Sequence, residues 1–195
     1  MTLRRCEWSS SDPIYIKYHD EEWGVPLHSD RKIFEFIVLD SMQAGLSWLT
    51  VLKKRENYRR AFDGFDPKKI SGFGRRKVEA LMIDPGIIRN RMKINATIRN
   101  AEAFDRIAGE FGSFDKYIWG FVGGKTITNK YASLSRIPAT SRESDAMSKD
   151  LKKRGFSFVG STICYAFMQA AGLVNDHATY CFRYSQVKRL SQRAR

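Results

Sequence analysis

The sequence contains few cysteines and no long apolar run. Its three cysteines, Cys6, Cys164 and Cys181, are an odd number without the spacing of a disulfide framework, which indicates a reducing compartment. No uninterrupted apolar run approaches the roughly 18 residues that a membrane-spanning helix needs, and the first residues lack the apolar core of a secretory leader. We therefore expect a soluble, cytoplasmic protein without a membrane partner.

The sequence also lacks internal repeats and the alternation of apolar residues that is typical of a parallel sheet. A weak strand-like alternation occurs only in residues 123–137, before Pro138. A hydrophobic fraction of 43% with 13% aromatic residues favours a globular chain, and 195 residues suit one domain. These features predict a mostly α fold in a single domain over residues 1–195, present as a monomer.

The net charge is strongly positive and unevenly distributed. The chain carries +13 at pH 7, but residues 1–52 hold five basic and eight acidic side chains, whereas residues 53–99 hold fourteen and five. A surface polarised in this way attracts polyanions such as nucleic acid. The same charge is also compatible with a soluble basic protein that binds no nucleic acid.

An acidic residue, Asp40, ends the apolar segment IFEFIVLD. We expect a helix from Asp30, as its cap, through Leu39, and the helical period places Asp40 on the apolar face. A carboxylate on that face is costly unless it is hydrogen-bonded or meets a cation. Asp40 is therefore either satisfied by backbone amides or part of a pocket.

A glycine break and a tryptophan follow directly. Gly45 ends the first helix, and Ser47 can cap a second one from Trp48 to Phe62. Trp48 then lies in the first turn, close to the preceding helix, and serves either as a core residue or as the wall of a pocket.

The next segment predicts two helices joined by a turn. Arg75 to Met82 and Arg91 to Phe104 have helical patterns, and the Asp-Pro-Gly sequence at 84–86 separates them. Helix N-terminal amides and basic side chains bind the phosphates of a DNA backbone. The alternative is an ordinary helical hairpin with a solvated basic face. The basic residues around it are Arg75, Arg76, Lys77, Arg89, Arg91 and Lys93.

Three further helices and a tail are expected downstream. One begins at Ser113, and the spacing of Thr140 and Glu143 indicates a capping box for a helix that ends near residue 154. A buried helix should cover residues 161–171, and the basic segment 188–195 reads as a frayed tail.

Cysteine and histidine residues near the two ends of the sequence could meet at a metal. His177 and Cys181 are four residues apart and would share one face of a helix. Cys6 and His19 could complete a tetrahedral Cys₂His₂ set, which suits structural zinc in a closed site. Because compact ligand spacings are missing, four unrelated residues remain the alternative. Cys164 is interpreted as a buried thiol.

Long segments of the sequence resemble the 3-methyladenine DNA glycosylase I family, which belongs to the helix-hairpin-helix superfamily. The resemblance covers about residues 4–184. It rests on CxW near the start, DPIYIKYHDEEWGVP, QAGLSWLTVLKKRENYRRAF, GIIRNRMKI, SDAMSKDLKKRGFSFVGSTICYAFMQAAGLVNDH and the final HxxxC. It implies a helix-hairpin-helix glycosylase architecture, with the hairpin element over about residues 75–104.

The resemblance also implies a function. The chain should be a base-excision repair enzyme, a monofunctional glycosylase that flips 3-methyladenine out of alkylated double-stranded DNA and releases it as the free base. Zn²⁺ would staple segments 4–23 and 173–184 together, with Cys6, His19, His177 and Cys181 as ligands.

Further site residues follow from the same resemblance. Asp40 takes the position of the family's pocket carboxylate, which is commonly Glu, so the carboxylate here is shorter by one methylene. Leu46 takes the position of an apolar plug that fills the gap left by the extruded nucleotide. The base pocket would consist of Trp8, Tyr18, Trp23 and Trp48, and the DNA-backbone anchor of Pro85, Gly86, Ile87, Ile88 and Arg89.

Two other functions compete with this expectation. A binding module for alkylated bases or bent DNA would need the same pocket and hairpin without bond cleavage. A zinc-stabilised RNA-binding protein is compatible with the charge, although the sheet-borne aromatic pattern of single-strand RNA modules is missing.

Overall fold

The computed structural model describes residues 3–9 and 12–193, and most of them are helical. The mostly α class is thereby confirmed. The α-helices are α1 (Pro13–Glu21), α2 (Asp30–Gln43), α3 (Trp48–Ala61), α4 (Pro67–Ser71), α5 (Arg75–Ile83), α6 (Arg91–Phe111), α7 (Phe114–Gly120), α8 (Arg142–Lys153), α9 (Ser161–Ala170) and α10 (Phe182–Arg193). Single 3₁₀ turns η1 (Glu7–Ser9), η2 (Asp63–Phe65) and η3 (Leu134–Arg136) accompany them, with strands β1 (Ile127–Thr128) and β2 (Val174–Asn175).

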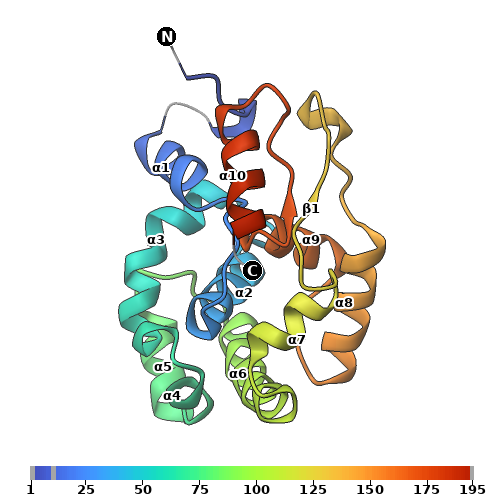
Figure 1. Ribbon diagram of the computed structural model, residues 1–195. Helices are drawn as coiled ribbons and strands as arrows, with labels where there is room; N and C mark the ends of the chain where they lie inside the picture. Colours follow the sequence, from blue (N-terminus) through green and yellow to red (C-terminus); the bar gives the residue numbers. More distant parts are fainter. Residues whose placement is uncertain (1–2, 10–11, 194–195) are drawn as a thin grey trace.

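Helix α2 forms the centre of the fold. It packs against α3, α6, α7 and α9, and Figure 1 shows it between α1 and α3 on one side and α7, α8 and α9 on the other. Every residue from Ile33 to Met42 is buried as a result. A helix that is apolar on all faces is one that neighbours surround. Because α2 is surrounded over this segment, the Asp40 side chain is buried too.

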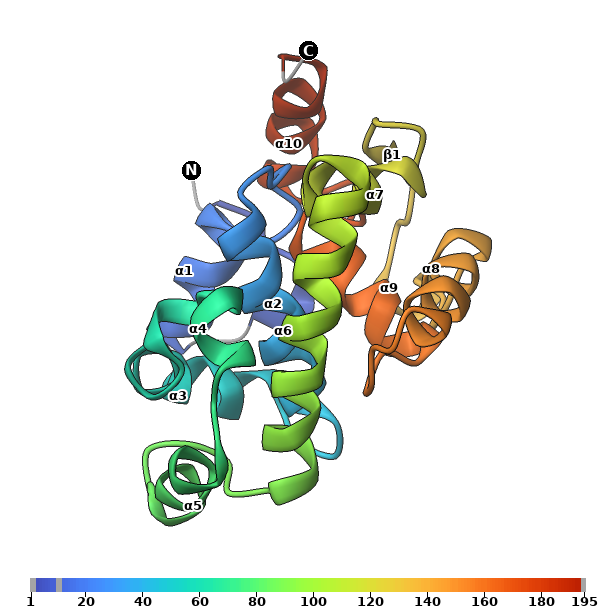
Figure 2. The same cartoon turned by 90° about the horizontal axis from the view of Figure 1, so that it is seen from below.

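Helix α6 lies alongside this centre and carries the predicted hairpin at its N-terminal end. It contacts α4, α5, α2 and α7, and Figure 2 shows it between α4 on one side and α8 and α9 on the other. The helix runs to Phe111, seven residues beyond the predicted Phe104, because it continues through Gly109 and stops only at Gly112, which adopts a left-handed φ of 84°.

Two capping predictions were wrong. Ser29, not Asp30, occupies the N-cap position of α2, and the Asp30 carboxylate instead accepts from the backbone amides of Phe114 and Asp115 at 3.0 and 2.7 Å. Asp30 thus caps α7, which lies far away in sequence. Helix α8 is capped one residue later than predicted, by a reciprocal pair between Ser141 and Ser144 in place of Thr140 and Glu143.

The end of the chain is more ordered than predicted. Helix α10 continues through Arg193, so residues 188–193 are helical rather than a frayed tail, and residues 194–195 lie outside the described part. Val187 on this helix is fully buried, and this packing explains why the helix persists.

The weak alternation in residues 123–137 yields one short strand. β1 pairs in parallel with β2, with Ile127 opposite Val174 and Thr128 opposite Asn175. The pair brings the segment after α9 alongside the segment after α7. In the described part of the chain, no helix is both long and apolar enough to cross a membrane.

Candidate functional site

A cavity of about 300 Å³ opens between the N-terminal segment, α2, α3 and α9. The predicted aromatic residues Trp8, Tyr18, Trp23 and Trp48 and the predicted carboxylate Asp40 all line it. The remaining lining residues, which no sequence pattern had indicated as a site, are Tyr15, Gln43, Leu134, Ile137, Ala166 and Gln169. Of these, only Tyr15 had a signal, since it belongs to the aromatic-rich N-terminal stretch.

The four predicted aromatic residues form a continuous chain of ring contacts. Trp8 meets Trp23 edge-on with ring centroids 4.8 Å apart, and Tyr18 lies 5.4 Å from Trp48. Tilted and edge-on contacts are the geometries that aromatic pairs prefer. The rings therefore support one another and leave their other faces for the cavity.

Asp40 reaches this cavity from α2. It is 2% exposed, and its Oδ2 has no hydrogen-bond partner among the described residues. The interpretation that backbone amides satisfy Asp40 is therefore wrong. Burial raises the pKa of Asp40 well above its ordinary value, and Arg55 opposes this rise only in part. The Arg55 guanidinium bonds instead to Glu22 and Glu35, at 2.6–2.9 Å.

Trp48 adds an unpaired donor to the same cavity. Its Nε1 is buried and also has no partner within the described part of the chain. Ser47 starts its helix by accepting from the Thr50 amide at 3.2 Å, after Gly45 with a φ of 80°, so both predicted signals position this tryptophan. A buried acceptor and a buried donor without partners in one cavity are the features of a ligand site.

A second cluster lies behind the aromatic wall. The four predicted ligands Cys6, His19, His177 and Cys181 are all buried, and their donor atoms lie within 4.8 Å of one another. Cys181 Sγ is 3.5 Å from His19 Nε2 and 3.6 Å from His177 Nδ1, and Cys6 Sγ is also 3.6 Å from that Nδ1. This arrangement can hold a metal ion with two sulfur and two nitrogen donors.

The outer nitrogens of both histidines are occupied. His19 Nδ1 lies 2.7 Å from the Asp20 carboxylate, which Arg5 also holds, and His177 Nε2 lies 2.9 Å from the carbonyl oxygen of Trp23. Carboxylates and carbonyls only accept, so these nitrogens donate and the inner nitrogens keep their lone pairs. Burial also lowers the pKa of His177, which favours the neutral ring.

The sequence identified the four residues of this cluster, but one reason was wrong. His177 and Cys181 do not share a helix, since residues 176–181 form a loop after β2 and α10 begins at Phe182. The third cysteine, Cys164, is buried outside the cluster and its thiol lies 3.4 Å from the Val159 carbonyl oxygen, in accord with its interpretation as a buried thiol.

The predicted hairpin lies between α5 and α6. Pro85 and Arg89 are exposed, Ile87 is buried, and Gly86 and Ile88 are intermediate. The Gly86 amide bonds to the Asp84 carboxylate at 2.7 Å and the Ile88 amide to the Tyr58 hydroxyl at 3.0 Å. These two amides are therefore occupied within the chain.

The basic residues near the hairpin divide into two groups. Arg75, Arg76 and Arg89 are exposed, whereas Arg91 pairs with Glu79 and Lys77 with Asp63. Lys54, which the sequence analysis left out, donates to the carbonyl oxygens of Pro85 and Gly86 at 3.0 and 3.3 Å.

Lys93, which the sequence placed among the basic residues around the hairpin, is buried. It is 7% exposed, and its ammonium donates to the carbonyl oxygens of Met42 and Ala44 at 2.9 and 2.7 Å. These carbonyls lie at the C-terminal end of α2, two residues or more before Leu46, which is 42% exposed. Lys93 thus joins the hairpin helix to the loop that follows Asp40.

Comparison with known proteins identifies the family of this chain. The family model described as methyladenine glycosylase matches residues 8–184. The chain belongs to the methyladenine glycosylase family. The glycosylase expected from the resemblance is thereby confirmed, and the binding-module and RNA-binding alternatives are not supported.

Individual methyladenine glycosylases agree with this assignment. DNA-3-methyladenine glycosylase 1 of Escherichia coli (strain K12) is 53% identical over 182 residues, which cover 93% of this chain and 97% of that protein. A crystal structure of 3-methyladenine DNA glycosylase I has a TM-score of 0.90 at 55% identity and covers 92% of this chain and 98% of its own. A tyrosine-to-phenylalanine variant of such an enzyme, solved in complex with 3-methyladenine, has a TM-score of 0.89 at 36% identity, with 91% and 96% covered.

Proposed function

We propose that this chain hydrolyses the N-glycosidic bond of 3-methyladenine in alkylated duplex DNA, and so begins base-excision repair of that lesion. The observation that carries the proposal is that two buried groups, the Asp40 Oδ2 acceptor and the Trp48 Nε1 donor, line one aromatic cavity and have no hydrogen-bond partner among the described residues. A flat, cationic base with an exocyclic amine and ring-nitrogen acceptors complements all three features.

Charge explains the preference for a methylated base. Aromatic faces attract a cation by about 0.5–2 kcal/mol per contact, according to its desolvation. Burial raises the pKa of the Asp40 carboxyl because it disfavours the charged form, and Arg55 opposes this rise only in part. A bound cationic base adds to this opposition and favours the ionised carboxylate. Neutral, unmodified adenine lacks this contribution, so the pocket discriminates by charge.

The reaction needs little acid catalysis. The methylated base already carries positive charge, so the C1′–N9 bond breaks with its electron pair moving to N9, and water adds to C1′ and loses a proton. Asp40 accepts a hydrogen bond from the exocyclic amine and stabilises the charge near the leaving base. Trp48 Nε1 donates to a ring nitrogen. The rest of the aromatic wall excludes water from the base.

The base must leave the duplex before it can enter the cavity, at a cost of a few kcal/mol. Leu46 is the apolar residue proposed to fill the vacated space, since it is exposed at the tip of the loop between α2 and α3. The segment Pro85–Arg89 is proposed as the turn of a helix-hairpin-helix element that holds the DNA backbone. Support comes from its exposed Arg89 and from Arg75 and Arg76, which lie exposed on the adjoining helix α5.

The Cys₂His₂ cluster is proposed to hold structural Zn²⁺. Its donor set of two thiols and two imidazoles with fixed outer nitrogens fits zinc, and four protein ligands leave no position for a catalytic water. When bound, the ion would supply a rigid cross-link between the N-terminal segment and the loop after β2.

We also propose that the protein acts as a cytoplasmic monomer, because one chain supplies the pocket, the cluster and the hairpin.

The decisive experiment is chromatography of the free bases released from methylated duplex DNA. Wild-type protein should release 3-methyladenine, whereas Asp40→Asn and Trp48→Phe should release at least tenfold less at equal protein concentration. Cys164→Ser, which changes a buried thiol outside the pocket, is the matched control. Tight binding of the same DNA without base release would contradict hydrolysis and would favour a module that only captures the lesion.

A further inference from the structure

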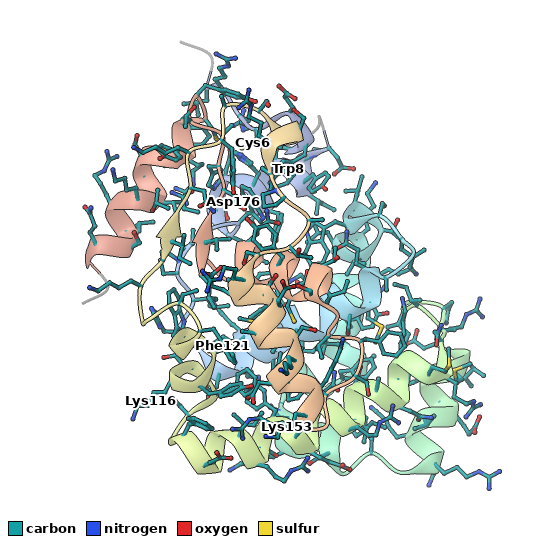
Figure 3. All side chains as sticks on the ribbon, turned by 90° about the vertical axis from the view of Figure 1, so that its right-hand side faces the viewer. Cys6, Trp8, Lys116, Phe121, Lys153 and Asp176 are labelled. Atoms are coloured by element: carbon teal, nitrogen blue, oxygen red, sulfur yellow. The ribbon has the colours of Figure 1, made fainter. Side chains whose placement is uncertain are left out.

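A second carboxylate, Asp176, lies next to the cavity and is fully engaged. It is 1% exposed and accepts three hydrogen bonds, from Asn129 Nδ2 at 2.7 Å, the Tyr165 hydroxyl at 2.7 Å and Gln169 Nε2 at 2.8 Å. Figure 3 shows Asp176 inside the fold, below Cys6 and Trp8 in that view. Gln169 extends from α9 and lines the cavity.

The contact between these two residues fixes the direction of the glutamine amide. The Gln169 NH₂ group donates to Asp176 Oδ2, so its Oε1 points away from that carboxylate. Turning the amide over would set Oε1 against the Asp176 oxygen, which is an acceptor beside an acceptor. Asn129 donates to the other oxygen of the carboxylate, Oδ1, and holds Asp176 in place. Gln169 therefore offers the cavity an oriented acceptor.

We propose that Gln169 is a specificity-determining residue, whose Oε1 accepts a hydrogen bond from the exocyclic amine of the base, and that Asp176 is its positioning residue. The proposal rests on the proposed function, because it concerns the base that this pocket binds. The amine of a methylated adenine has two hydrogens, and Asp40 and Gln169 take one each. The exocyclic amine is the only conventional hydrogen-bond donor on the free base, so Asp40 and Gln169 both bind this one group.

The arrangement excludes guanine-type bases. A 3-methylated guanine has a carbonyl oxygen where adenine has the amine. That oxygen would face Oε1 of Gln169, with no hydrogen between them, and would leave a buried acceptor unsatisfied. A site built around a hydrogen bond rejects a base that cannot form it far more strongly than a site that selects by shape alone.

The test compares two free bases, 3-methyladenine and 3-methylguanine. Their binding is measured by quenching of tryptophan fluorescence, and their release from methylated duplex DNA is measured in the same protein samples. Gln169→Met keeps the length of the side chain but removes the acceptor, so the preference for 3-methyladenine should fall by roughly tenfold to a hundredfold. Asp176→Asn lets the Gln169 amide turn and should reduce the preference in the same direction.

Tyr165→Phe is the matched control, since it removes another donor to the same Asp176 oxygen and leaves the contact of Gln169. It should keep the ratio of the two affinities. An unchanged ratio in Gln169→Met, or an equal loss for both bases with a lower Tm, would overturn the assignment while leaving the glycosylase function intact. Wild-type protein that neither binds nor releases 3-methyladenine would overturn the proposed function itself.

Discussion

His177 lies edge-on to Trp23, with ring centroids 4.6 Å apart, and donates from Nε2 to the carbonyl oxygen of the same tryptophan at 2.9 Å. The contact leaves Nδ1 facing the two cysteines. One residue thus belongs to the Cys₂His₂ cluster and at the same time supports the wall of the base cavity. The other histidine of the cluster also contacts the aromatic wall: the His19 ring lies edge-on to Trp8, with centroids 5.2 Å apart.

Removing the metal should therefore loosen the pocket as well as the fold. A ligand present at about a thousand times its Kd contributes about 4 kcal/mol. For a chain of this length that corresponds to a fall in Tm of roughly 8–16 °C on chelation. Calorimetry with and without a chelator measures the shift, and binding of free 3-methyladenine should weaken in parallel.

Elemental analysis of two cysteine variants tests which thiols hold the ion. Cys181→Ser should lose most of the bound zinc, whereas Cys164→Ser, with its thiol outside the cluster, should retain it. Equal zinc content in both variants would count against the cluster as the metal site.

The buried carboxyl of Asp40 should make stability depend on pH. Its pKa is raised in the folded protein, so the folded state keeps a proton that the unfolded chain loses above its ordinary value of about 4. The free energy of unfolding should consequently fall as the pH rises from about 4 towards the folded pKa. Asp40→Asn has no such proton, so its Tm should increasingly exceed that of the wild type over this range. Parallel Tm curves for the two proteins would contradict the burial argument.

Lys93 should control the loop that carries Leu46. Lys93→Met leaves the carbonyl oxygens of Met42 and Ala44 without their donor, at a cost of about 1–3 kcal/mol in stability. Because the loop then loses its anchor, excision from duplex DNA should fall more than the affinity for free 3-methyladenine.

A double-mutant cycle separates this effect from general destabilisation. If Lys93 acts through the loop, combining Lys93→Met with Leu46→Ala should slow excision little more than Leu46→Ala alone. Additive losses would show that the two residues act independently.

Arg89 should contribute to the affinity for DNA without reading its sequence. Arg89→Ala removes an exposed cation from the hairpin, so binding should weaken uniformly across DNA sequences and the salt dependence should lose about one unit of slope. Lys116→Ala is the control, because it removes the same charge from α7, at the edge of the molecule in Figure 3. Equal effects of both substitutions would indicate a purely global charge effect.

Local signals in the sequence predicted local structure well. Gly45 and Ser47 gave the break and the cap that position Trp48, and the helix pattern placed Asp40 in the interior. The residues that the sequence misplaced depend on distant partners. Lys93 reads as a surface cation because its acceptors lie 49 and 51 residues earlier, and the Asp30 cap serves a helix 84 residues later. No local sequence pattern indicated Gln169 as a site residue, since the orientation of its amide depends on Asp176 in another segment.

The pairing of Cys6 with His177 spans 171 residues and closes a loop that contains nearly all the rest of the described fold. Contacts of such separation form slowly, whereas those within neighbouring helices form fast. In refolding experiments, helical circular dichroism should accordingly recover before the tryptophan environment of the base cavity does. Addition of zinc should speed the second phase and leave the first unchanged.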